Sequence, residues 1–122
     1  MLLPQEYHLY SGSNNLDVVG WFYDNYDADA QQYLKPVGTK HPNAFGIYDM
    51  SGNIFEWVWD RYGGYTSENS KNPTGPEKGS YRVLRGGFWK NKMWSLRVSS
   101  RFFFEPTKRK SRFGCRFCRI PY

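Results

Sequence analysis

The sequence contains little cysteine and histidine and no long hydrophobic run. No apolar stretch approaches the ~20 residues that a membrane-spanning helix requires, and the first ten residues lack the basic start of a signal peptide. The two cysteines, Cys115 and Cys118, are too few for a structural zinc site, which takes about four ligands. Both lie in a strand-like segment, where residues three apart face opposite sides. We therefore expect packed or free thiols rather than a disulfide.

Basic residues are scarce in the first half of the chain, and acidic residues are scarce in its last third. Residues 1–60 hold eight acids and two lysines, whereas residues 88–122 hold ten Lys and Arg and one acid, Glu105. The net charges of these two segments are −6 and +9, within a total of +6. This separation suggests that the acidic residues 1–60 attract cations, and that the basic residues 88–122 attract anions or acidic partners.

Aromatic residues are abundant, at 20% of the 122 residues. A chain of this length predicts one domain, residues 1–122. The sequence shows no convincing amphipathic helix, and its loops are long and rich in Pro, Gly and Asn. Short runs of β-branched and aromatic residues predict strands within residues 16–22, 53–62, 81–89, 95–104 and 113–120. These features predict a mixed fold of short strands with irregular connections.

Two carboxylates lie in an otherwise apolar run, IYDMSGNIFEWVWD. In a strand over residues 54–58, Glu56 shares a face with two aliphatic side chains, so its carboxylate needs a partner. One candidate is Arg85, on the following predicted strand. The other is a hard cation such as Ca²⁺, held by Asp49, Glu56 and the carbonyls of the turn between them. The residues alone leave these alternatives open.

A second acidic stretch, YDNYDADAQ, places Asp24, Asp27 and Asp29 close together. Its default interpretation is a solvated acidic loop, and the alternative is a cation held by a single carboxylate together with loop carbonyls. It is not an EF-hand, because it lacks the central glycine and the terminal glutamate.

Several motifs occur in order along the chain: YSGSNNLDVVGWF, KPVGTKHPNAFGIYDMSGNIFEWVWD, NPTGP, GSYRVLRGGFW and LRVSSR. Together they resemble the formylglycine-generating enzyme family, also called the sulfatase-modifying factor domain, over roughly residues 10–117. The resemblance implies an α+β, C-type-lectin-like fold with short strands, long irregular loops and little helix. It also implies bound calcium at two sites. The first set is Asp49, Gly52, Ile54 and Glu56; the second is Asn15, Leu16, Asp29 and the main chain near Gln31.

The founding activity of the family oxidises a substrate cysteine with oxygen and copper(I), which a pair of cysteine thiolates holds. The corresponding segment here, RGGFWKNKMWSLRVSSR, contains no cysteine, and Asn91 and Ser95 cannot replace two thiolates. A related branch uses histidine-ligated iron, but His8 and His41 lie far apart in other contexts. No copper is expected, and the sequence does not favour an enzyme.

Family domains usually carry a longer portion ahead of the YSGSN motif, so the chain is expected to be a partial or minimal version. The missing cover predicts an exposed apolar patch or sheet edge, which self-association or docking to another chain would hide.

A third group of relatives uses the scaffold for variable binding surfaces that diversity-generating retroelements rewrite. The segment RGGFWKNKMWSLRVSSRFFFEPTKRKSRFGCR, residues 85–116, keeps the framework of such proteins, which runs from RGG to a final G-x-R. The aromatic and basic residues within 88–113 have the chemistry of binding hot spots. Three successive phenylalanines cannot all point inward from one strand, so at least one should be exposed. The candidate contact residues are Lys90, Asn91, Lys92, Trp94, Phe102, Phe103, Phe104, Lys108, Lys110, Ser111 and Arg112.

The leading hypothesis is a non-catalytic module that binds a protein or other ligand through residues 88–113, with calcium ordering its loops. The alternatives are an oxidase of the family acting on a peptide cysteine, and a remnant without function. Basic and aromatic residues also suit single-stranded nucleic acid, but the acidic first half would repel phosphate, so we do not expect this partner.

Overall fold

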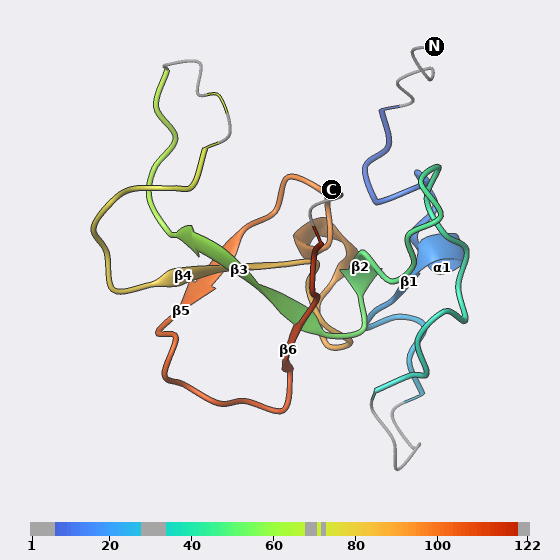
Figure 1. Cartoon of the computed structure of the whole chain (residues 1–122). Helices are drawn as coiled ribbons and strands as arrows, with labels where there is room; N and C mark the ends of the chain where they lie inside the picture. The colour runs from blue at the N-terminus through green and yellow to red at the C-terminus, as the bar shows by residue number, and fades with distance from the viewer. Residues whose placement is uncertain (1–6, 28–33, 68–70, 72, 120–122) are drawn as a thin grey trace.

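The structure is a computed structural model that describes residues 7–27, 34–67, 71 and 73–119. Figure 1 shows a four-stranded sheet on one side, a small layer of α1, β1 and β2 on the other, and long loops between them. Within the described residues, no helix has the length and apolar character to cross a membrane. The elements in chain order are α1 (Leu16–Val19), β1 (Gly20–Trp21), β2 (Ser51–Gly52), β3 (Phe55–Arg61), β4 (Arg82–Arg85), the 3₁₀ turn η1 (Met93–Ser95), β5 (Phe102–Phe104) and β6 (Phe113–Cys115).

Strand β3 is an inner strand of the larger sheet, whose order is β5-β4-β3-β6. Strand β4 runs antiparallel to β3, and β5 runs antiparallel to β4. The last strand, β6, pairs with β3 in parallel, which places Gly114 beside Glu56. This late, parallel return brings the C-terminal segment next to the acidic motif of the middle of the chain.

Aromatic packing holds one face of this sheet together. Phe55 is buried, and its ring centroid lies 4.7 Å from that of Phe102 and 5.1 Å from that of Phe88. Trp57, two residues further along β3, meets Phe113 of β6 edge-on at 5.2 Å. The alternation that predicted a strand around Phe55 and Trp57 therefore reflects a real packed face.

A second core lies around α1. Its buried residues are Tyr10, Leu16, Val19, Phe22 and Leu96. Leu96, just after η1, comes from a distant part of the sequence and is only 1% exposed. The segment that follows the RGG motif is thus anchored in the N-terminal core.

Gly52 and Asn53 join the two cores through their backbones. Both adopt positive φ, at 87° and 64°, and a Cβ on Gly52 would collide with the carbonyl of Trp21. The amide of Gly52 donates to Gly86 O at 2.7 Å, and that of Asn53 donates to Trp21 O at 2.8 Å. The carbonyl of Asn53 accepts from Trp89 N at 3.1 Å. Glycine fits here because it adopts this conformation without steric cost.

Of residues 81–89 only Arg82–Arg85 form a strand, and of residues 113–119 only Phe113–Cys115 do. Two other predicted strands were wrong in larger part. Residues 16–22 form α1 before the two-residue β1, because the Asn15 side chain accepts from Asp17 N and so starts a helical turn. Of residues 95–104, only Phe102–Phe104 form a strand. Leu96 turns inward while Val98 is 55% exposed, so this stretch presents no alternating face to a sheet.

Candidate functional site

The first calcium set of the sequence analysis gathers around one cavity. Asp49, Gly52, Ile54 and Glu56 all line a pocket of about 540 Å³. Asp49 precedes β2 and has a left-handed backbone with φ of 58°, whereas Glu56 lies on β3. The turn through β2 therefore folds the two carboxylates of IYDMSGNIFEWVWD toward the same space.

Arg116 is the charged partner of Glu56. Its Nη2 lies 2.6 Å from Glu56 Oε1, and its Nε lies 2.9 Å from Oε2, which is a two-pronged contact. The hydrogen bond to Glu56 raises the pKa of Arg116 above its ordinary value, so the guanidinium stays charged at neutral pH. Bidentate pairs of this kind are among the strongest hydrogen-bonded contacts in proteins.

The sequence analysis missed Arg116 and offered Arg85 instead. Arg85 does lie opposite Glu56 in the β3–β4 register, but its Nη1 donates to the carbonyls of Val98 and Ser100. The signal for Arg116 was the final G-x-R of the framework, Gly114–Arg116. Because β6 pairs Gly114 with Glu56, the residue two places later shares that face and reaches the carboxylate.

Asp49 keeps one oxygen without a partner. Its Oδ2 accepts from Gly38 N at 2.7 Å, and its main-chain oxygen accepts from Arg116 Nη2 at 3.3 Å. Its Oδ1 is buried and has no hydrogen-bond partner among the residues that the structure describes. A buried carboxylate oxygen without a hydrogen-bond donor raises the free energy of the folded state. A cation or a donor group that bound this oxygen would remove that cost.

The donor set fits a calcium ion in part. Asp49 Oδ1 is a hard oxygen that is not otherwise used, which is what Ca²⁺ prefers. The Gly52 carbonyl already accepts from Ile54 N at 2.9 Å, and Glu56 would have to share its oxygens with Arg116. In the part of the chain that the structure describes, no three His, Cys, Asp or Glu side chains cluster for a metal. An ion at Asp49 would therefore depend on main-chain oxygens.

The second calcium set is only partly described. Asn15 Oδ1 accepts from Asp17 N at 3.1 Å, and the carbonyl of Leu16 accepts from the amide of Gly20. Both atoms thus serve the ends of α1. Asp29 and Gln31 lie outside the described residues.

The segment 88–113 is spread over three places. Its first part surrounds η1, where Lys92 Nζ pairs with Asp24 Oδ1 at 3.0 Å and lies 3.4 Å from the ring centroid of Tyr23. Asn91 shapes the turn, since its Oδ1 accepts from Phe88 N at 3.0 Å. Trp94 is 62% exposed, and Lys90 is also exposed.

The second part is β5. Phe102 and Phe104 are half-buried, while Phe103 between them is 44% exposed, which confirms that one of the three faces outward. The ring of Phe103 lies 4.2 Å from that of Tyr62 and 5.1 Å from that of Tyr81. Phe103 therefore belongs to an exposed aromatic stack rather than to the core.

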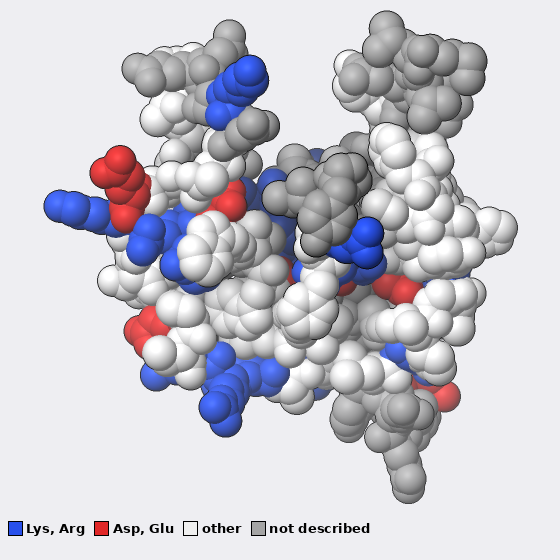
Figure 2. All heavy atoms as spheres, in the orientation of Figure 1, with Lys and Arg blue, Asp and Glu red and all other residues white. Residues whose placement is uncertain are grey.

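The third part is the basic loop between β5 and β6. Lys108 Nζ lies 3.5 Å from Glu105 Oε2, and Lys110 and Ser111 are exposed. Arg112 is half-buried, with its guanidinium 5.4 Å from the ring of Phe88. Figure 2 shows basic side chains along the lower margin and, together with acidic ones, at the left margin of the face seen there.

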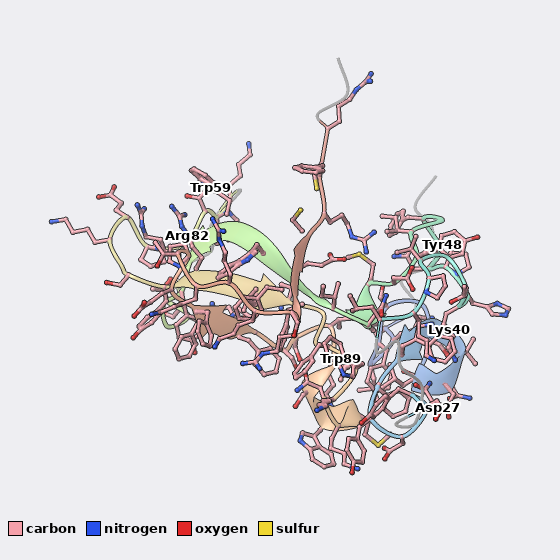
Figure 3. The ribbon with its side chains drawn as sticks, turned by 90° about the horizontal axis from the view of Figure 1, so that it is seen from below. Asp27, Lys40, Tyr48, Trp59, Arg82 and Trp89 are labelled. Atoms are coloured by element: carbon pink, nitrogen blue, oxygen red, sulfur yellow. The ribbon has the colours of Figure 1, made fainter. Side chains whose placement is uncertain are left out.

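Exposed aromatics also occur outside residues 88–113, and the sequence analysis did not single them out. Trp59 is 77% exposed. The guanidinium carbon of Arg82 lies against its ring, 4.6 Å from the ring centroid (Figure 3). Tyr65 is 78% exposed. The alternation of β3 indicated that Trp59 shares a side with Phe55, but the sheet register shifts between Trp57 and Arg61. That irregularity is not visible in the sequence.

The short strands, the small amount of helix and the long ordered loops define a C-type-lectin-like fold of the formylglycine-generating-enzyme type. The chain belongs to the family of the Sulfatase-modifying factor enzyme 1-like domain, whose family model matches residues 5–120. Both the predicted fold class and the predicted family are thereby confirmed.

Three relatives show the range of proteins that contain such a domain. The serine/threonine-protein kinase pkn1 of Chlamydia pneumoniae is 42% identical over 62% of this chain and 13% of its own. The formylglycine-generating enzyme of Mus musculus is 33% identical over 75% of this chain and 26% of its own. The structure of Treponema denticola variable protein 1 superposes with a TM-score of 0.78, at 32% identity, over 91% of this chain and 40% of that one. The chain thus spans less than half the length of each.

Proposed function

We propose that this chain is a non-catalytic binding module, with residues 88–113 as its contact surface for a protein or another ligand. The observation that carries the proposal is the exposed aromatic stack at β5, where Phe103 lies against Tyr62 and Tyr81. Exposed aromatics beside Arg and Lys are the residues that dominate binding energy at interfaces. The resemblance to a protein named a variable protein supports the same direction.

The family's oxidase activity is not favoured. The segment from Arg85 to Arg101 contains no cysteine. Asn91, one of the polar residues in that segment, holds the turn after Gly87 through its hydrogen bond to Phe88 N. Cys115 and Cys118 lie on and after β6 and are free and exposed.

We further propose that calcium binds at Asp49, where the buried Oδ1 lacks a hydrogen-bond donor. Asp49 would supply the charged ligand, and Gly52, Ile54 and Glu56, which line the same cavity, would complete the set. The ion would neutralise the carboxylate and hold the loop before β2. The second set, with Asn15, Leu16 and Asp29, remains a weaker proposal because Asn15 and Leu16 already serve α1.

A peptide-display selection tests the binding proposal. Immobilised wild-type protein is used to select peptides from a random library, and the affinity of each enriched peptide is then measured by fluorescence anisotropy. We expect Phe103→Ala and Trp94→Ala to weaken binding by about tenfold or more, because each removes an exposed aromatic anchor. The matched control is Phe45→Ala, an aromatic that is 77% exposed in the turn before β2.

Two outcomes would count against the proposal. One is a selection without enriched peptides; the other is a set of peptides that lose as much affinity with Phe45→Ala as with Phe103→Ala. The rival activity is tested separately by oxygen consumption with a cysteine peptide and copper(I). Copper-dependent turnover would overturn the non-catalytic assignment.

A further inference from the structure

A second cavity, of about 590 Å³, lies against the larger sheet near the ends of β3 and β4. Val58 and Val83 provide an apolar floor, and Tyr65 and Pro76 line it from the loops. Two arginines from different segments, Arg85 of β4 and Arg101 just before β5, also line it. The cavity combines apolar walls with the guanidinium groups of two arginines.

Backbone carbonyls fix both guanidinium groups in place. Arg85 Nη1 donates to Val98 O at 3.1 Å and to Ser100 O at 2.9 Å. Arg101 Nη2 donates to Gly63 O at 3.0 Å, and its guanidinium lies 3.9 Å from the ring centroid of Tyr65. A guanidinium carries five N–H donors, so each arginine retains further donors on Nε and its other terminal nitrogen.

Charge is not balanced in this cavity. Arg85 and Arg101 are half-buried, and neither forms an ion pair with a carboxylate in the described part of the chain. Asp60 and Arg61 also line the cavity and offset each other in formal charge. Two partly buried like charges without a counterion are unfavourable, and a bound anion would relieve the repulsion.

We propose that this cavity binds a small organic anion, a carboxylate or phosphate carried on an apolar body. Arg85 and Arg101 hold the anionic group, because the flat fork of a guanidinium matches the oxygens of carboxylate and phosphate. The valine floor and the ring of Tyr65 take the apolar body. The cavity adjoins the β5 part of the proposed contact surface, because Arg101 directly precedes β5 and Val83 is the strand partner of Phe103. Anion binding there does not require that surface to bind a partner.

The test uses benzoate and phenyl phosphate as probes and uncharged benzamide as the neutral control. Binding to the chain is followed by ¹⁵N NMR, including the Nε–H signals of the arginines. We expect saturable shifts at Arg85, Arg101 and Tyr65 with at least one anion, at about millimolar or lower concentrations. The anion that binds more tightly identifies the carboxylate or the phosphate class. Shifts should weaken with salt, because screening reduces charge attraction.

Matched variants separate the site from general charge effects. Arg101→Gln should weaken anion binding about tenfold or more, whereas Arg109→Gln, on the exposed β5–β6 loop, has the same net charge and should leave it unchanged. Tyr65→Ala, at a highly exposed position that tolerates truncation, should also weaken binding. Trp94→Ala should not, which separates this result from the η1 part of the contact surface. The proposal is overturned by equal shifts with benzamide, by no saturable shift with either anion, or by undiminished binding in Arg101→Gln.

Discussion

Asn53 shows how one side chain can organise a loop of this fold. Its Nδ2 donates to Lys35 O and its Oδ1 accepts from Lys35 N, both at 3.0 Å. The side chain is 5% exposed, and the backbone has φ of 64°, which asparagine tolerates better than most residues. With its main chain bound to Trp21 and Trp89, Asn53 uses every polar group that it has.

Asn53→Ala is therefore expected to lower the free energy of unfolding by about 2–4 kcal/mol, from two lost buried hydrogen bonds and the left-handed backbone. Asn53→Gly is the matched control, because glycine removes the backbone cost and leaves the hydrogen-bond loss. Chemical denaturation measures both variants. A loss below about 0.5 kcal/mol for the alanine variant would show that the clamp on Lys35 contributes little.

The carboxylates of the first cavity make a second prediction, on calcium. Wild-type protein should melt several degrees higher in millimolar calcium than in chelator, since a ligand at 100 times its Kd adds about 2.7 kcal/mol. Asp49→Asn should remove this calcium increment and change little in chelator. Glu56→Gln should weaken the increment and also lower the melting temperature in chelator, because it breaks the pair with Arg116.

Differential scanning fluorimetry in calcium, magnesium and chelator measures these shifts. Asp24→Asn, an exposed carboxylate that pairs with Lys92, is the control and should keep the full increment. A wild-type melting temperature that does not respond to calcium would refute the calcium proposal. In that case the ion pair with Arg116 would by itself explain why Glu56 is tolerated in an apolar strand.

Sequence reasoning reached part of this residue-level arrangement. One of the two alternatives that the residues left open placed Asp49 and Glu56 around one cation, and both acids do line one cavity. The sequence did not identify Arg116 as the partner of Glu56, because the two residues meet only through the parallel pairing of β6 with β3. Strand partners far apart in sequence leave little local signal.

At the scale of elements, the three residues of β5 divide between packing in the interior and exposure at the surface. Phe102 and Phe104 face the aromatic interior, where their rings meet Phe55 and Phe113 at 4.7 and 5.2 Å. Phe103 points the other way and stacks on Tyr62. The alternation of a strand thus assigns packing to the outer two residues and exposure to the middle one.

Phe103→Ala should reduce the affinity for selected peptides more than it reduces stability, with a loss of about 1 kcal/mol or less in unfolding free energy. Trp57→Ala should do the reverse and cost about 2–4 kcal/mol, because it opens a gap beside Phe113. Urea denaturation and peptide affinity are compared for both variants. Equal or greater destabilisation by Phe103→Ala would place that ring in the core and contradict the assignment.

Elements differed in how far their sequences revealed them. β3, β4 and β6 follow runs of aromatic and β-branched residues, and the structure places strands there. α1 was not foreseen, because four residues are too few to show helical periodicity and its cap, Asn15, also suits a turn. η1 was not foreseen either, because it has only three residues. The burial of Leu96 after it depends on a core whose other residues come from the start of the chain.

At the scale of the whole molecule, apolar exposure is extensive. Phe45, Trp59, Tyr65 and Val37 are each more than 75% exposed, and Phe117 reaches 93%. Scattered apolar residues are ordinary on a protein surface, but large contiguous patches mark contact sites. Whether these side chains form the patch expected from the sequence, and what would cover it, stays a prediction.

We expect the isolated chain to self-associate. Its average mass in sedimentation should rise above 14.4 kDa between about 5 and 200 µM, because apolar contacts hide this surface. The association should persist at about 0.5 M NaCl, where charge pairing between the acidic and basic halves would be screened. Loss of association at high salt would assign it to charge, and a monomer throughout would refute it.

The loop between β5 and β6 has a practical consequence for engineering. Two turns of this loop are closed by backbone hydrogen bonds, from Lys108 N to Glu105 O and from Phe113 N to Lys110 O, and residues 105–111 are exposed. Neither core takes a side chain from that stretch. Foreign recognition sequences could accordingly be grafted between Glu105 and Ser111, which would make this small chain a display framework whose specificity is chosen by the experimenter.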